Sequence, residues 1–137
     1  MTPHLRKKLP LDFGTVDIYN DYVIATFNEG LLFDHSHMEK LYEIFHLYFP
    51  DRPFGYISNR QFEYAIDPTC YLKENDAPWL AAYAALCYTE RSYKSALFER
   101  KFYKHRPYKP FYTLETCLEW IVRRVQNHYK EKPPVGR

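Results

Sequence analysis

The segment Leu80-Ala-Ala-Tyr-Ala-Ala-Leu-Cys-Tyr88 decides the fold, because it can be interpreted either as a helix or as a strand. Its alanines favour a helix by intrinsic propensity. Helical patterns flank the segment on both sides, however, and it contains no charged side chain. Its length is that of a parallel strand buried on both faces, where small side chains let helices approach closely. We therefore predict a central strand over residues 80–88.

Runs of β-branched and aromatic residues predict the remaining strands. Thr15–Tyr19 and Tyr22–Phe27 are separated by Asn20-Asp21, a pair that tolerates the backbone of a two-residue hairpin turn. Phe54–Asn59 is short and β-rich and directly follows a helical pattern, which indicates an interior strand. Together with Phe111-Tyr112 and the central segment, these runs predict five strands.

Apolar spacing and capping residues predict four helices, over residues 36–49, 67–73, 89–103 and 113–129. Ser36 and Glu39 have the spacing of a capping box at the start of the first helix. Asp67-Pro68 is a strong start signal, because Asp accepts free amide hydrogens and Pro loses nothing at the first helical position. Thr89 and Thr113 are the capping residues of the last two helices.

Successive strand–helix units of this kind require a largely parallel sheet with right-handed crossovers. A length of 137 residues indicates one domain. We expect an α/β fold: a mixed, mostly parallel five-stranded sheet with an N-terminal hairpin and flanking helices, over residues 13–130. Residues 1–12 and 131–137 are rich in proline, and we expect a flexible N-terminal arm and a flexible tail there.

The composition lies in the globular range, with 46% hydrophobic and 26% charged residues and a net charge of +2. No run approaches the roughly 18 apolar residues of a membrane span. The first residues, MTPHLRKKLPLDFG, place charge where a signal peptide has its apolar stretch, so we expect a soluble cytoplasmic protein. Three cysteines without a C-x-x-C pair indicate buried thiols rather than a disulfide framework or a zinc site.

A hairpin followed by strand–helix turns, over about residues 13–129, resembles the STAS family, the domain of sulfate-transporter tails and anti-sigma-factor antagonists. The stretch Lys109-Pro-Phe-Tyr-Thr-Leu-Glu-Thr-Cys-Leu-Glu-Trp-Ile121 is similar to the last strand and helix of small bacterial STAS-like proteins. The resemblance implies a non-catalytic, regulatory module that binds a protein partner.

The resemblance also implies a switch, in which a partner kinase phosphorylates a Ser or Thr at the start of the helix after the third strand. That site usually reads Asp-Ser in the family. This sequence departs from the pattern, since Asn59–Ile66 intervenes before Asp67-Pro68-Thr69 and the Asp-Ser pair is absent. The nearest hydroxyls, and the candidates for modification, are Ser58 at the strand end and Thr69 at the helix start.

Polar residues follow several predicted strands, and ligands of parallel sheets bind outside the carboxyl ends of the strands. The candidate residues of this ligand or partner rim are Glu29, Asn59, Arg60, Thr89 and Arg91. If their strands are neighbours, Arg60 and Arg91 lie close together and form a forked-donor site for a phosphate or a carboxylate. The competing interpretation is that these residues cap helices and solvate the rim.

Two other patterns suggest a metal site and a nucleic-acid site. The spacing of the histidines opposes the first, and the small net charge opposes the second. His37 and His46 are nine residues apart and fall on opposed sides of one helix, so we expect no metal site. Lys101–Tyr112 interleaves basic and aromatic side chains in the manner of a single-strand nucleic-acid platform. A net charge of +2 is small for a protein that binds through phosphate neutralisation, so nucleic acid is the less favoured partner.

The sequence contains no Gly-rich phosphate loop, no G-x-S-x-G elbow and no thiol–base motif, so we expect no enzyme activity and no cofactor. The main alternative to a partner-binding module is a carrier of a small apolar ligand or lipid, since the architecture partly resembles the SEC14-type lipid-transfer fold. Its ligand would occupy an apolar pocket between sheet and helix. The face of Tyr42, Phe45 and Tyr48 could serve either the core or a homodimer contact.

Overall fold

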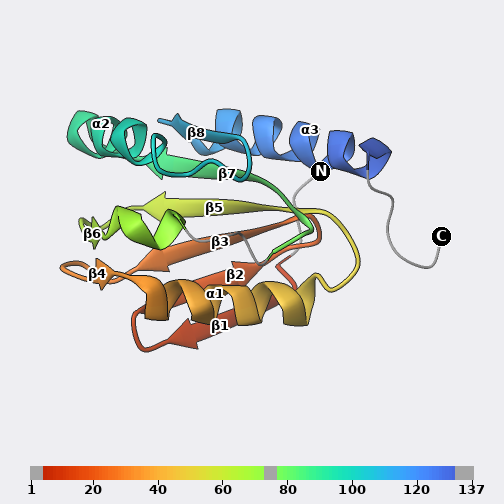
Figure 1. The fold of residues 1–137 in the computed structure, drawn as a ribbon, viewed down its shortest axis with the longest axis horizontal. Helices are drawn as coiled ribbons and strands as arrows, with labels where there is room; N and C mark the ends of the chain where they lie inside the picture. The colour runs from red at the N-terminus through yellow and green to blue at the C-terminus, as the bar shows by residue number, and fades with distance from the viewer. Residues whose placement is uncertain (1–4, 73–76, 132–137) are drawn as a thin grey trace.

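The structure is a computed structural model that describes residues 5–72 and 77–131. Its centre is a six-stranded sheet (Figure 1), whose strands lie in the spatial order β1 (Lys7–Leu11), β2 (Gly14–Ile18), β3 (Tyr22–Phe27), β5 (Phe54–Arg60), β7 (Leu80–Cys87) and β8 (Tyr108–Phe111). The first three strands pair antiparallel, and β3, β5, β7 and β8 pair parallel. The fold is therefore α/β with a mixed, mostly parallel sheet, as predicted.

The other elements are the helices α1 (His35–Tyr48), α2 (Glu90–Glu99) and α3 (Leu114–Glu131), the 3-10 helix η1 (Pro68–Tyr71), and a small parallel pair of strands, β4 (Leu32–Phe33) and β6 (Ala65–Ile66). The buried apolar residues of α1, η1 and α2 share one core cluster with Tyr83, Ala85 and Cys87 of β7. The buried residues of α3 share a second cluster with Ala82 and Ala84. The sheet is thus covered on both faces, by α3 alone on one of them.

This distribution of helices follows from the handedness of the connections. The parallel strands advance across the sheet in the order β3, β5, β7, β8 without reversing. Since right-handed crossovers that advance in one direction all lie on the same face, α1, η1 and α2 pack on one side. The chain reaches the opposite face only after β8, and α3 covers it there. The loops after the parallel strands collect at one end of the sheet.

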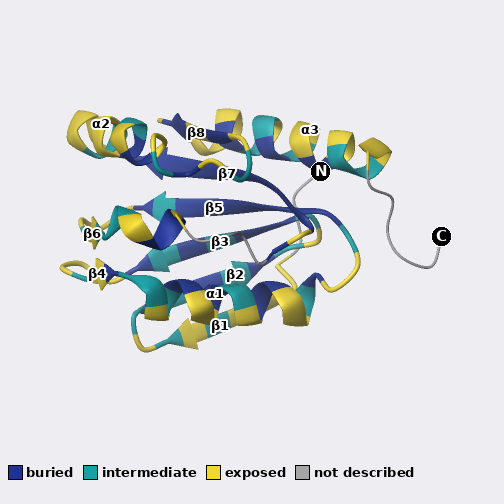
Figure 2. Cartoon of the chain, viewed as in Figure 1, coloured by how far each residue is buried: buried dark blue, intermediate teal, exposed yellow. Residues whose placement is uncertain are grey.

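The predicted central strand is confirmed. Every residue of β7 is buried, and Figure 2 shows burial along both β5 and β7. The hairpin of β2 and β3 is confirmed, as is the interior position of β5 between β3 and β7. Cys70, Cys87 and Cys117 are buried free thiols, as predicted.

The sheet has six strands, so the prediction of five was wrong. The additional strand, β1, lies inside the segment that the sequence indicated as a flexible arm. It is an edge strand, where Pro10 is tolerated because the proline needs no ladder partner on its outer side. The Lys8 ammonium donates across to the Asp17 carboxylate at 2.9 Å. The basic residues thus mark an exposed edge.

Several local boundaries also differ from the predictions, and α2 ends at Glu99 rather than at residue 103. Asp34, not Ser36, is the N-cap of α1, and its capping box is completed by His37 rather than Glu39. The last strand begins at Tyr108, before the predicted Phe111, because an edge strand tolerates the proline between them.

The predicted end of the short helix at Lys73 lies outside the described residues, as does the tail after residue 131. In the described part of the chain, no helix combines the length and hydropathy of a membrane span.

Candidate functional site

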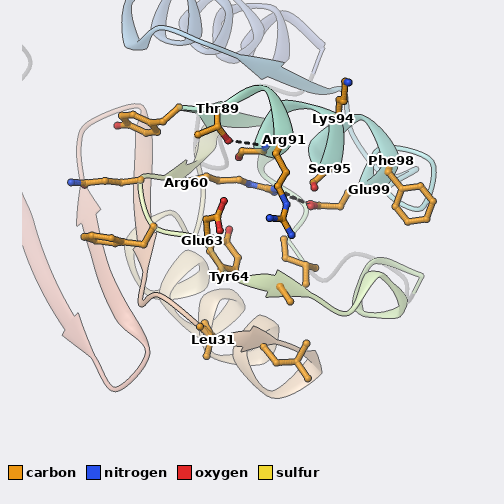
Figure 3. Close-up of a pocket in the computed structure, with 18 of the residues that line it drawn as sticks. Leu31, Arg60, Glu63, Tyr64, Thr89, Arg91, Lys94, Ser95, Phe98 and Glu99 are labelled. Atoms are coloured by element: carbon orange, nitrogen blue, oxygen red, sulfur yellow. Dashed lines mark hydrogen bonds and ion pairs between the residues drawn. The ribbon is translucent and has the colours of Figure 1, made fainter.

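An open groove lies at the carboxyl ends of β5 and β7 (Figure 3) and has a volume of about 1180 Å³. Helix α2 forms one wall, and the loop and strand of residues 61–66, with residues 30–32, form the opposite wall. We call it the α2–β6 groove. Its position follows from the fold, because the loops after parallel strands converge at this end of the sheet.

The base of the groove is a buried ion pair. Arg60, the last residue of β5, donates from Nη1 to Glu99 Oε2 at 2.7 Å and from Nη2 to Glu99 Oε1 at 2.8 Å. The two residues are 8% and 7% exposed. A two-pronged pair of this kind orients both side chains as well as holding them together. It ties the end of α2 to the end of β5.

Phenol hydroxyls surround this pair and form further hydrogen bonds with it. Arg60 Nη2 also donates to the hydroxyls of Tyr83 at 3.3 Å and Tyr108 at 3.1 Å. The Tyr108 hydroxyl donates in turn to Glu99 Oε1 at 3.1 Å. The Tyr71 and Tyr83 hydroxyls lie 2.8 Å apart. Buried charges are tolerated only when they are paired and hydrogen-bonded, and this pair meets both conditions.

The electrostatics of the cluster favour a fixed charge pair among neutral phenols. Burial raises the pKa of the Tyr83 hydroxyl above its ordinary value, although the Arg60 charge acts in the opposite direction. Burial likewise raises the pKa of Tyr64 and, well above its ordinary value, that of Tyr108. Burial by itself would lower the pKa of Arg60, but the Glu99 carboxylate and the phenol oxygens that accept its hydrogen bonds outweigh it and raise that pKa. The phenols therefore stay protonated at neutral pH and provide no base.

Three of the predicted rim residues, Arg60, Thr89 and Arg91, line this groove, and their strands β5 and β7 are neighbours. Thr89 is the N-cap of α2, where its hydroxyl oxygen accepts from the Ser92 N–H at 3.0 Å. Arg91 is exposed, and Figure 3 shows its side chain extending from α2 toward Glu63 on the opposite wall.

In the structure, Arg60 and Arg91 do not present their guanidinium groups together as the predicted forked-donor pair. The Arg60 guanidinium is turned inward and is occupied by Glu99 and the phenols. Arg91 alone of the two presents its charge to the open space of the groove. No ion pair joins it to another described residue, whereas Lys94 pairs with Glu90 at 3.0 Å.

The other two rim residues lie beside the groove. Asn59 donates to Thr26 Oγ1 at 3.0 Å and accepts from the Tyr88 hydroxyl at 2.7 Å, so it links the ends of three neighbouring strands. Glu29 is exposed in the loop after β3 and does not line the groove, although the adjacent Gly30 does.

The two candidate hydroxyls for modification differ in accessibility. Ser58 is fully buried, with its oxygen 2.8 Å from the Tyr64 hydroxyl and 3.2 Å from Arg60 Nε, so a kinase cannot reach it in the folded chain. Thr69 is exposed at the start of η1, where its hydroxyl donates to Asp67 Oδ1 at 2.7 Å.

The aromatic residues of the segment 101–112 are largely turned into the core. Tyr103, Tyr108 and Phe111 are buried and cannot stack on bases. The Arg106 guanidinium donates to the backbone carbonyls of Leu80, Ala77 and His105. These aromatic residues and Arg106 therefore serve packing and loop closure, whereas Lys101, Lys104, Lys109 and Tyr112 are exposed.

The space between sheet and α1 is filled by rings. Phe45 is buried, with its ring centroid 4.9 Å from that of Phe54 and 5.6 Å from that of Tyr56. Tyr42 and Tyr48 pack against the same core. The apolar face of α1 is therefore packed against the core.

The His37 ring has a structural role, since its Nδ1 accepts from the Asp34 N–H at 3.0 Å. Within the described ranges, 5–72 and 77–131, no three His, Cys, Asp or Glu side chains are grouped so that they could hold a metal ion.

Sequence reasoning missed Glu99, Tyr64 and the short strands β4 and β6. A signal for Glu99 was present, since Ala96, Glu99 and Tyr103 follow one another at spacings of three and four along the buried side. A charged residue on such a stripe indicates a buried partner. The two-residue strands carry no periodicity that a pattern could detect.

Comparisons of the chain with models of protein families, with curated proteins and with solved structures found no match.

Proposed function

We propose that the protein is a non-catalytic, STAS-like module that binds a protein partner, and that the partner docks in the α2–β6 groove. The observation that carries the proposal is that three exposed apolar side chains line the groove walls. Leu32 is 57% exposed, Phe62 43% and Phe98 53%, and all three line the groove. Apolar groups gathered at one concave surface mark interaction sites, whereas single exposed ones are ordinary.

The shape and chemistry of the groove favour a protein segment over a small molecule. Its volume of about 1180 Å³ lies above the range of roughly 300–1,000 Å³ that is typical of ligand pockets. At the floor of the groove, Arg60 and Glu99 form an ion pair with each other, and protonated phenols surround them. These paired and protonated groups supply neither a nucleophile nor a general base, which supports a binding role.

The STAS-like part of the proposal is supported by the architecture: an antiparallel start, a parallel sheet, and connections that advance in one direction. For a phosphorylation switch of the kind the family implies, Thr69 is the accessible candidate. It directly follows Pro68, which lines the groove. A phosphate at this position would add negative charge beside the docking surface.

A peptide-display selection tests the proposal. A library of random dodecapeptides on phage is selected against the immobilised full chain and, in parallel, against the Leu32→Asp/Phe98→Asp variant. Leu47→Asp is the matched control, since Leu47 is 72% exposed on α1 and does not line the groove. All three proteins are first checked for equal thermal stability.

We expect the unmodified chain and the Leu47 control to enrich a shared sequence motif that the groove variant does not enrich. Absence of an enriched motif, or equal enrichment by the groove variant, would overturn the proposal. Native mass spectrometry of the purified chain tests the carrier alternative, since a co-purified lipid would also contradict a protein-docking groove.

A further inference from the structure

The wall of the groove opposite α2 is a short strand that is paired on one side only. The Ala65 N–H donates to the Leu31 carbonyl at 2.8 Å, and the Asp67 N–H donates to the Phe33 carbonyl at 2.8 Å. These bonds join β6 to β4 in a parallel register, with Leu32 opposite Ala65 and Phe33 opposite Ile66. The residues of β6 that bond to β4 are therefore the alternate ones, on either side of Ile66.

The backbone of Ile66 consequently points away from β4. Successive peptide groups of a strand point to opposite sides, so the Ile66 N–H and carbonyl lie on the outer edge of β6. Among residues 5–72 and 77–131, no backbone group forms a hydrogen bond with this N–H or carbonyl outside the β4–β6 ladder. Ile66, Ala65 and Tyr64 all line the α2–β6 groove, so this open edge borders the groove.

The edges of the large sheet are blunted, in contrast to β6. Its two outer strands, β1 and β8, each contain a proline, Pro10 and Pro110, which lack the N–H that an added strand would need. Proline on outer strands is a common protection against pairing with other chains. Among the described strands, β4 and β6 each keep one unpaired edge, and on β6 that edge carries the outward N–H and carbonyl of Ile66, a residue that lines the groove.

The α2 wall of the groove indicates which charge the partner segment carries. Arg91 extends from α2 into the groove toward the exposed Glu63 of the opposite wall, and among the described residues no ion pair joins it to that carboxylate or to another. A cation beside the N-terminal turn of α2 favours an anionic group there, because the helix dipole acts in the same direction. The charge on this wall is complementary to an acidic side chain of a segment lying along β6.

We propose that the partner segment is an extended peptide that adds to β6 as a third strand and places an acidic side chain against Arg91. The inference rests on the proposed function and deepens it. Backbone hydrogen bonds to Ile66 hold the peptide, and its apolar side chains contact Leu32, Phe62 and Phe98. This is recognition by strand addition, in which the backbone supplies affinity and alternate side chains supply specificity.

The test uses the dodecapeptide that the phage selection enriches, synthesised and titrated into the full chain by calorimetry. Each of its backbone nitrogens is methylated in turn. Strand addition predicts that methylation weakens binding at least tenfold at alternate residues and has little effect at those between them. Hydrogen–deuterium exchange measured by NMR is expected to show slower exchange of the Ile66 amide hydrogen in the complex than in the free protein.

Variants of the protein supply the second arm. Ile66→Pro removes the outward N–H without breaking a bond to β4 and is compared with Ile66→Ala, which keeps the N–H. We expect the proline variant to bind at least tenfold more weakly than the alanine variant. Arg91→Glu is expected to weaken the acidic peptide by a similar factor, whereas Arg123→Glu, on the exposed side of α3, leaves its affinity unchanged.

The outcomes separate this inference from the proposed function. A groove-dependent peptide that shows no alternation in the methylation series, or leaves Ile66 exchange unchanged, overturns strand addition and leaves the docking groove intact. Equal affinity for the unmodified chain and Arg91→Glu overturns the acidic requirement. Sedimentation that shows a dimer through β6, abolished by Ile66→Pro and competing with the peptide, would identify a second copy as the occupant and overturn the proposal.

Discussion

Arg60 and Glu99 lie 39 positions apart in the chain and meet at the base of the groove through two nearly parallel hydrogen bonds of 2.7 and 2.8 Å. The contact joins the last residue of β5 to the last residue of α2. Helix α2 fully buries Ala96 and Glu99 and packs Tyr93 against the core and the Tyr112 ring, so the ion pair is one of its main attachments to the sheet. The position of one groove wall therefore depends on this pair.

We predict that Glu99→Ala lowers the free energy of unfolding by about 3 to 5 kcal/mol, because it leaves the Arg60 guanidinium buried without its counter-ion. Both side chains are less than a tenth exposed, so solvent screens the charge little. Urea denaturation monitored by circular dichroism measures the change. A loss below about 1 kcal/mol would show that water reaches Arg60 and that the pair is not sealed.

The double variant Arg60→Met/Glu99→Leu is the control for this first prediction. Replacing both members of a buried pair by apolar residues of similar size is often neutral or stabilising. We expect the double variant to be more stable than Glu99→Ala alone. If both variants lose the same free energy, the loss arises from the shape of the site and not from the uncompensated charge.

Thr89→Ala is expected to lower the free energy of unfolding by about 1 kcal/mol, because the Ser92 N–H loses its capping acceptor. Thr89→Asp keeps an acceptor at the same place and should remain close to the unmodified protein. Thermal and urea unfolding of the two variants test the cap. An equal effect of both substitutions would mean that the threonine methyl group, and not the hydroxyl, stabilises the start of α2.

Gly55→Ala tests the contact between β5 and α3. A Cβ atom at this position would lie 2.5 Å from Ile121 Cγ2 and 3.0 Å from its Cδ1, and Ile121 is fully buried. A β-branched side chain has little freedom to move aside, so we expect a loss of about 1 to 3 kcal/mol. In a double-mutant cycle, Ile121→Ala should recover part of that loss. Strictly additive effects would contradict the contact.

Raising the pH above 9 is expected to lower the free energy of unfolding, because the thiols of the folded chain are buried. Burial raises the pKa of the Cys70 and Cys117 thiols to about 12, from an ordinary value of 9.0. Above pH 9 the unfolded chain loses these protons while the folded chain keeps them, so the free energy of unfolding falls as pH rises from 9 toward 12. Each such group adds a slope of up to about 1.4 kcal/mol per pH unit.

Urea unfolding at intervals from pH 8 to pH 10.5 measures this slope. Cys117→Ala is the matched variant, since it removes one of the titrating thiols, and its stability should fall less steeply with pH. A slope that is the same in both proteins would mean that the Cys117 thiol ionises in the folded state as readily as in the unfolded one.

Much of the fold was predictable because it depends on short-range patterns. The absence of charge from Leu80 to Tyr88 outweighed the helix propensity of its alanines, and the structure has a fully buried strand there. The caps at Asp67, Thr89 and Thr113 were also predictable, since a cap is a contact between residues two or three positions apart.

Elements whose stability comes from distant partners were not predictable in the same way. β1 carries Pro10 and two lysines, and it forms a strand only because β2 offers a free edge. β6 has two residues and exists because β4 lies alongside it. For the same reason, Arg60 was expected to face a ligand, whereas its neighbour across the core is Glu99.

The order of amino acids alone determined the alternation of strands and helices, the parallel core and the ends of the helices. These depend on hydrophobic period and on hydrogen bonds between near neighbours. The tertiary structure decided which charges are buried together, which edge of a strand stays open and which side chains form the walls of the groove. Such contacts join residues far apart in the chain, and only the packing of α2, β5 and β6 around a common end of the sheet sets their distances.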